Sequence, residues 1–207
     1  MTESNVLAPP SVVDRIFGAV VEAQTWRNVL YLMVSFPLGL VYFVFTVTGI
    51  CVGTGLALIA VGIPILVFTL MVVGIFGRFE RFLLRELLHA DVADPRPAPL
   101  PSGIVESLRA YLRRPETWKT VVYSLVHLPF SVIAFALVVS FIPAGAVLLL
   151  TPLTYTILPV DICGAPVTNL DQAVLCSSLG AILMLIGLHL MNGWAALWKR
   201  VGGTLLE

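Results

Sequence analysis

Charged side chains are scarce in this sequence of 207 residues. Only 12% of the residues are Asp, Glu, Lys or Arg, whereas 58% are hydrophobic, and the mean hydropathy is +0.99. So few charges cannot cover the surface of a soluble domain or provide a basic face for nucleic acid. The composition therefore predicts an integral membrane protein whose surroundings are the lipid bilayer, with no nucleic-acid partner.

Four long runs contain no Asp, Glu, Lys or Arg at all. They cover 28–51, 54–77, 120–142 and 174–197. A hydrocarbon core about 30 Å thick is crossed by roughly 20 helical residues, and a charge at its centre costs about 2.5–3.5 kcal/mol on insertion scales. The runs predict an all-α membrane protein with four transmembrane helices.

The positive charges are confined to three segments. All 12 Lys and Arg residues lie before the first run, between 78 and 119, or at 199–200. Because cytoplasmic loops carry the excess of Lys and Arg, this distribution predicts a multi-pass protein of the cell membrane with both termini in the cytoplasm.

Cysteine is also rare, and familiar catalytic motifs are absent from the sequence. Cys51, Cys163 and Cys176 form no metal-ligand or redox spacing. Cys51 and Cys163 are both expected near the outer face, where they either pair or remain free thiols. No HExxH, GxSxG or Walker sequence occurs. We therefore expect no catalytic residues, no metal ion, no cofactor and no enzymatic activity.

What the sequence does contain is an internal similarity at an offset of 92 residues. The segment 25–47 shares eight identities with the segment beginning at Thr117, among them a Trp, a Tyr and a Pro. This predicts one membrane domain, 1–207, built from two repeats, about 12–88 and 104–206. Each repeat contributes one hairpin, and the two hairpins are expected to be parallel, related by a pseudo-twofold axis along the membrane normal.

Short amphipathic segments flank the predicted hairpins. Apolar residues at helical spacing within 12–24 and 104–112 predict interfacial helices. The basic segments 78–88 and 194–206 are expected to lead each hairpin out of the membrane. A cytoplasmic linker is predicted at 89–103, where proline alternates with other residues.

The second repeat carries an insert of about 24 residues within 141–173, on the predicted outer side. Its run 143–158 is apolar but short for a crossing, so we expect a re-entrant or outer-surface helix.

Tryptophan beside a cation is expected to anchor the helices at the interface, because an indole prefers the headgroup zone. These anchors are Trp26, Arg27, Trp118, Lys119, Trp194 and Trp198. Pro37 and Pro129 lie at equivalent positions of the repeats, where each removes a backbone hydrogen bond. They are predicted to kink their helices as hinges or as packing features.

His127 and His189 are the titratable side chains expected inside the spans, apart from thiols and tyrosines. Each is nine residues from a tryptophan anchor, so the two share a predicted depth, with Asn192 one turn from His189. They form a candidate polar or sensing pair, or they are neutral histidines satisfied by the backbone.

The segments "TWRNVLYLMVSFPLGLVYFVF", "GLALIAVGIPILVFTL" and "GRFERFLL", with a second "TWK" at Thr117, resemble a sensor-domain family of prokaryotic membrane proteins. That domain is often found ahead of histidine kinases. The resemblance covers about 12–202 and implies a membrane-embedded input module. Because the sequence ends at Glu207, the implied partner is a histidine kinase or another cytoplasmic regulator acting in trans. The alternative is a small transporter or channel-like protein that works as a homo-oligomer.

Overall fold

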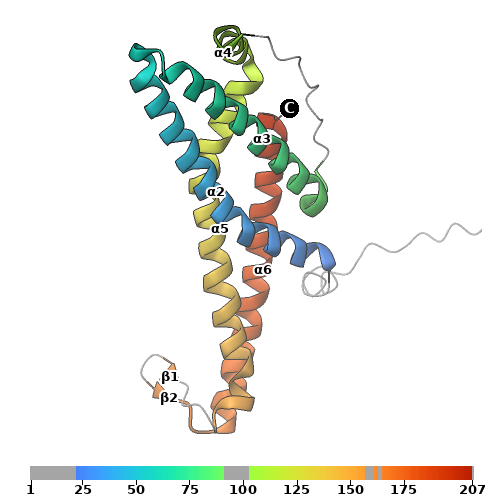
Figure 1. Ribbon diagram of the computed structural model, residues 1–207. Coiled ribbons are helices and arrows are strands. Elements are labelled where there is room, and N and C mark those ends of the chain that lie inside the picture. The colour runs from blue at the N-terminus through green and yellow to red at the C-terminus, as the bar shows by residue number, and fades with distance from the viewer. Residues whose placement is uncertain (1–21, 91–102, 157–160, 163–164, 207) are drawn as a thin grey trace, which may run out of the picture. The chain divides into compact units, whose positions relative to one another are not determined.

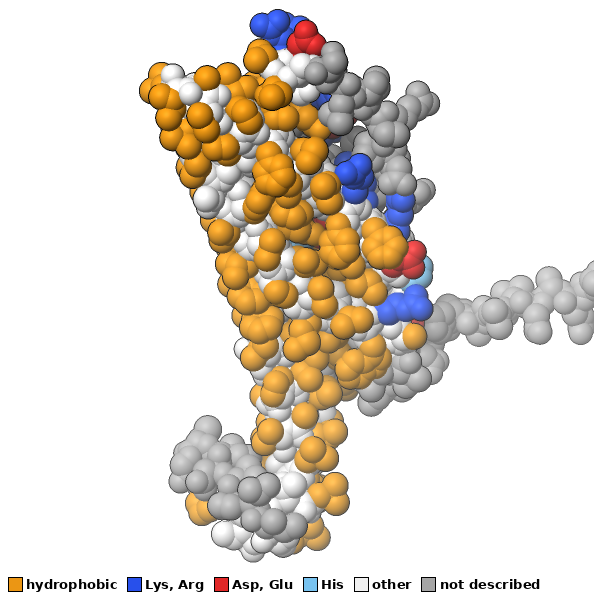
Figure 2. Space-filling model, in the orientation of Figure 1, with side chains coloured by type: hydrophobic (Ala, Val, Ile, Leu, Met, Phe, Trp, Pro, Cys, Tyr) orange, Lys and Arg blue, Asp and Glu red, His pale blue; other side chains and the backbone are white. Residues whose placement is uncertain are grey.

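The computed structural model describes residues 22–90, 103–156, 161–162 and 165–206. The elements follow in the order α2 (Ala23–Gly55), η1 (Leu56–Ile59), α3 (Gly62–Leu88), α4 (Ile104–Arg113), α5 (Pro115–Thr154), β1 (Asp161–Ile162), β2 (Ala165–Pro166) and α6 (Leu170–Leu206) (Figure 1). Four helices, α2, α3, α5 and α6, are long and apolar enough to cross a membrane. Hydrophobic side chains cover most of the face shown in Figure 2, as expected for helices that face lipid.

The chain divides into two compact units. Of the described residues, the first unit comprises 22–26 and those within 139–190, and the second unit comprises those within 27–138 and 191–206. Helices α5 and α6 contribute residues to both units.

In the first unit, α5 and α6 form a closely packed antiparallel hairpin. A Cβ added to Gly180 would lie 2.6 Å from the backbone nitrogen of Leu149, and one added to Gly187 would lie 2.6 Å from Cβ of Phe141. The Ser177 hydroxyl also donates to the Leu149 carbonyl at 3.1 Å. Small residues at this contact allow the two backbones to approach, as is common between membrane helices.

In the second unit, α2 and α3 form another antiparallel hairpin. A Cβ on Gly49 would lie 2.4 Å from the Thr69 side chain, and one on Gly53 would lie 2.6 Å from that of Leu66. Ala60, with φ of 59°, ends η1 in the left-handed conformation before α3 begins.

The predicted helix over 104–112 is confirmed as α4. Leu108 and Tyr111 pack against Leu70 and Val73 of α3, whereas Ile104, at the start of α4, is exposed. The helix is therefore amphipathic, with its inner face covered by protein.

The separate helix expected over 143–158 is not found. Residues 143–154 continue α5 without a break, so α5 has 40 residues and α6 has 37. At 1.5 Å per residue these helices are about 60 and 55 Å long, well above the 30 Å of a hydrocarbon core. Part of the predicted insert thus lies in the C-terminal end of α5, and part lies in the first turn of α6.

Several predicted features lie outside the described residues. They are the interfacial helix 12–24 up to residue 21, most of the linker 89–103, and Cys163. Among the described cysteines, Cys51 is exposed, Cys176 is buried, and both are free thiols.

Candidate functional site: a buried carboxylate between helices

Glu80 of α3 is fully buried in the second unit. Its Oε1 accepts hydrogen bonds from the hydroxyl groups of Tyr31 in α2 and Tyr123 in α5, the latter at 2.9 Å. Both tyrosines are themselves 1% exposed. The Glu80 side chain of α3 is therefore hydrogen-bonded to both α2 and α5.

His127 lies beside the same carboxylate oxygen. Its Nδ1 is 3.9 Å from Glu80 Oε1 and 3.3 Å from the Tyr123 hydroxyl. Its Nε2 is 3.0 Å from Ser35 Oγ and 3.2 Å from the Ser35 carbonyl. Each ring nitrogen therefore faces an oxygen that can accept a hydrogen bond, so the site accommodates a proton on either nitrogen.

Aromatic rings enclose the imidazole of His127. The ring centroids of Tyr42, Tyr123 and Trp198 lie 5.5, 5.4 and 5.1 Å from that of His127. Trp198 brings α6 into the cluster and stacks on Phe130 at 4.2 Å. We refer to Glu80, Tyr31, Ser35, Tyr123, His127 and Trp198 as the Glu80 cluster.

The cluster is only partly satisfied by protein hydrogen bonds. Among the described residues, four buried side-chain atoms have no hydrogen-bond partner, namely Glu80 Oε2, Tyr42 Oη, Thr46 Oγ1 and Trp198 Nε1. An unpaired buried polar group costs about 1–3 kcal/mol. Much of the stability of this region therefore depends on how its polar atoms are arranged.

Arg81, next to Glu80, joins α3 to the end of α6. Its Nε and one terminal nitrogen donate to the Leu206 carbonyl at 3.0 and 2.9 Å, and the side chain is 5% exposed. A cation at a helix C-terminus is favourable because the last carbonyl groups lack helical partners.

His89 caps the C-terminus of α3 in the left-handed conformation, with φ of 49°. It contacts residues of both α2 and α6. Arg27 donates to His89 Nε2 at 3.2 Å, and Lys199 donates to the His89 carbonyl at 2.6 Å. Two cationic side chains therefore lie at the C-terminus of α3, where a positive charge interacts favourably with the helix dipole.

The predicted polar residues fall in different surroundings. His127 lies in the Glu80 cluster of the second unit. His189 lies in the first unit, is exposed, and its Nδ1 is 2.9 Å from the Leu185 carbonyl of its own helix. Asn192 accepts a hydrogen bond from Asn28 at 2.8 Å and so joins α6 to α2.

The predicted anchors also differ from one another. Trp26 and Trp118 are 45% and 50% exposed. The Trp194 indole donates to the Phe130 carbonyl at 3.3 Å. Trp198 is 1% exposed and packs inside the cluster, so its indole does not lie at the surface. Arg27 and Lys119 are exposed, and α2 and α5 continue as helices through Pro37 and Pro129.

Sequence reasoning missed Glu80, because it ended the second span at residue 77 and assigned 78–88 to a basic amphipathic helix that leads out of the membrane. The missed signal is the continuation of the buried stripe of α3 at spacings of three and four residues. The buried residues of that stripe are Leu70, Val73, Gly77, Glu80, Arg81, Leu84 and Leu88.

Comparison with known proteins gives one family. A family model described as "putative sensor" matches residues 1–52 and 31–206. No curated protein and no solved structure gives a significant match to this chain. Among the described residues, no group of three or more His, Cys, Asp or Glu side chains is arranged to hold a metal ion.

Proposed function

Because this chain belongs to the family described as putative sensors, we propose that it passes a stimulus from the bilayer or the envelope to a separate cytoplasmic signalling protein. The observation that carries this proposal is the Glu80 cluster. A single buried carboxyl group accepts hydrogen bonds from side chains of α2 and α5. Trp198 of α6 packs against one of these side chains, Tyr123. A change at any of these helices alters the surroundings of the same group.

A sensor needs two packings that differ by a few kcal/mol. Two of the unpaired polar atoms, Glu80 Oε2 and Trp198 Nε1, belong to the cluster, and each costs about 1–3 kcal/mol, which is the energy range of such a switch. A small rotation of one helix can pair some of these atoms and release others. The cluster is therefore a suitable bistable element, because its hydrogen bonds are discrete and the helices around it are rigid.

The output is expected at the helix ends near His89. Arg27, His89 and Lys199 connect α2, α3 and α6 there, within about three turns of Glu80 along α3. The positive charges of this region support a cytoplasmic location for these ends and for both termini. A histidine kinase or another regulator in trans would bind this basic surface.

The proposal is tested by purifying the tagged protein from its native cells in mild detergent after in-cell crosslinking from the α6 end, followed by mass spectrometry. We expect a stoichiometric kinase, phosphatase or transcriptional regulator. The Glu80→Gln variant should retain the partner but change its phosphorylation or activity. Glu86→Gln is the matched control, because Glu86 is exposed on the same helix.

Recovery of this protein alone, at wild-type expression, would refute signalling through a stable partner. Equal output from wild type and Glu80→Gln would show that the cluster is not the switch.

The second candidate is a small transporter working as a homo-oligomer. It is favoured by a specific observation, since Glu80 is a buried carboxylate on a helix long enough to span the membrane and lies 3.9 Å from His127. Such pairs are common in proton pathways. Proton or solute flux into vesicles containing the purified protein, lost in His127→Phe, would establish this function instead.

A further inference from the structure

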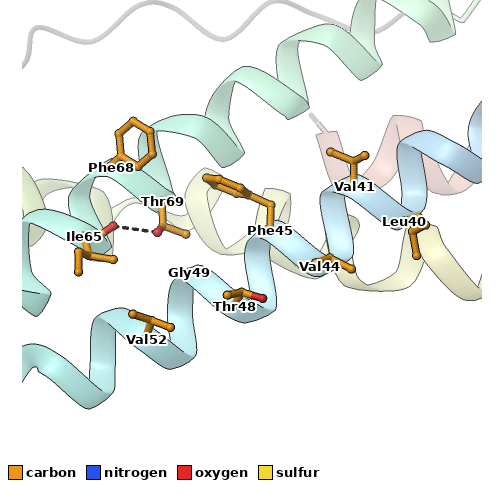
Figure 3. A pocket seen from close by; sticks show the side chains of 10 residues that line it. All are labelled: Leu40, Val41, Val44, Phe45, Thr48, Gly49, Val52, Ile65, Phe68 and Thr69. Carbon is orange, nitrogen blue, oxygen red and sulfur yellow. Dashed lines mark hydrogen bonds between the residues drawn. The ribbon is translucent and has the colours of Figure 1, made fainter.

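The helices α2 and α3 leave an open groove of about 650 Å³ beside their glycine contact (Figure 3). All of its lining lies in the second unit. The lining residues are Leu40, Val41, Val44, Phe45, Thr48, Gly49, Val52, Ile65, Phe68 and Thr69. We infer that this α2/α3 groove binds the acyl chain of a bilayer lipid.

The chemistry of the lining requires an apolar occupant. Apart from Gly49, the lining side chains are hydrophobic except for two threonines, and the Thr69 hydroxyl already donates to the Ile65 carbonyl at 2.8 Å. No Asp, Glu, Lys or Arg occurs between Arg27 and Arg78. A charged or strongly polar ligand would lose its hydration here without gaining partners.

The length and exposure of the groove suit an acyl chain. From Leu40 to Val52 the groove follows α2 for about 18 Å, at 1.5 Å per residue, close to the 15 Å or so of one leaflet of the hydrocarbon core. Leu40, Val41 and Val44 are 47%, 53% and 52% exposed on a helix apolar enough to cross the membrane, so the acyl chains of the bilayer can reach the groove directly.

The groove is held open by contacts that do not depend on its occupant. Gly49 and Gly53 fix the distance between α2 and α3 along one edge. Phe45 packs edge-on against Phe68 and Phe76, with centroids 6.3 and 5.5 Å apart, between the same two helices. A preformed groove loses little entropy when it is filled, which favours binding.

The test uses a phospholipid with a photoactivatable group on its acyl chain, incorporated into nanodiscs with the full-length protein. After illumination, labelled positions are mapped by mass spectrometry of peptides. We expect labelling concentrated within 40–52 and 65–69, in excess of other apolar residues of equal exposure. Because the groove mouth carries no charge, the labelling should not depend on the lipid headgroup.

The critical variant is Val44→Trp, with Leu30→Trp as its matched control. Val44 and Leu30 lie on the same helix and are each 52% exposed, but only Val44 lines the groove. Val44→Trp should reduce labelling of the groove at least about fivefold, because an indole at this central position of the α2 wall obstructs the path of the chain along the groove. Leu30→Trp should leave the labelling of the groove unchanged. If Val44→Trp does not fold, Val41→Phe replaces it as the variant that obstructs the groove.

Labelling spread in proportion to exposure, or equal effects of the two tryptophan variants, would overturn the inference. Disulfide crosslinking between two copies through Val44→Cys, together with a groove protected from lipid, would overturn it in favour of a second copy of this chain. The experiment measures binding and not signalling, so its outcome is independent of the sensor proposal.

Discussion

Ser35 and His127 share a hydrogen bond of 3.0 Å although 92 residues separate them. That separation equals the offset of the predicted internal repeat, so the two residues occupy equivalent positions. Tyr31 and Tyr123, which share an acceptor on Glu80, are also 92 residues apart. A Cβ on Gly39 would likewise meet Ser131, its equivalent. The centre of the second unit is thus built where residues 92 positions apart in α2 and α5 meet, the offset of the predicted repeat.

The Ser35–His127 bond is expected to contribute to stability as a coupled pair. His127→Phe keeps an aromatic ring among Tyr42, Tyr123 and Trp198 but removes both nitrogens. In a double-mutant cycle with Ser35→Ala, followed by unfolding in mild detergent, we expect a coupling energy of about 0.5–1.5 kcal/mol. Ser178→Ala is the control, because its hydroxyl bonds only to Val174 of its own helix. A coupling equal to that of the control would contradict the bond.

The two tyrosine hydroxyls should act through the same carboxylate. Tyr31→Phe and Tyr123→Phe each remove one donor to Glu80 Oε1, and we expect each to lower the free energy of unfolding by about 0.5–1.5 kcal/mol. In a Glu80→Leu background both losses should shrink, since the shared acceptor is absent. Tyr155→Phe, a change in the first unit, is the control. Equal losses in both backgrounds would show that the two hydroxyls do not stabilise the protein through hydrogen bonds to Glu80.

Much of the fold follows from simple patterns in the sequence. The four charge-free runs located the long helices, because a charge is costly in a bilayer and 20 residues suffice to cross it. The amphipathic spacing of 104–112 located α4. These features depend on local composition and periodicity alone, which a single sequence displays directly.

The candidate site was harder to predict, because burial depends on tertiary partners. Glu80 lies among Arg78, Arg81 and Arg85, a pattern typical of an exposed segment. The hydroxyls that satisfy Glu80 come from residues 49 and 43 positions away. Trp198 was predicted to be an interfacial anchor because Lys199 and Arg200 follow it. Its contacts with Phe130 and His127 depend on tertiary packing, which the sequence does not display.

The glycine contact between α5 and α6 predicts opposite effects for two substitutions in one helix. Gly180→Ala would place a methyl group against the backbone of Leu149, and we expect a loss of about 1–3 kcal/mol from overpacking. Gly193→Ala meets no atom within 4 Å and should stabilise α6 by about 0.5–1 kcal/mol, because alanine restricts the unfolded chain. Thermal unfolding in detergent measures both. Similar effects at the two positions would show that the hairpin is looser than the structure indicates.

The membrane orientation can be measured with single cysteines in a background that lacks Cys51, Cys163 and Cys176. Leu58→Cys lies in η1 between α2 and α3 and is 96% exposed, while Glu116→Cys lies at the exposed start of α5, beside several arginines. In the second unit Phe36 stacks on Phe135 and Tyr42 lies against His127, so α2 and α5 run antiparallel and the two positions lie at the same end of this unit. An impermeant thiol reagent added to intact cells should therefore label both positions or neither. After permeabilisation both should react equally, which controls for accessibility. Labelling of position 58 alone would mean that both hairpins enter the membrane from the same face, as the distribution of Lys and Arg predicts, and that α2 and α5 do not pack antiparallel.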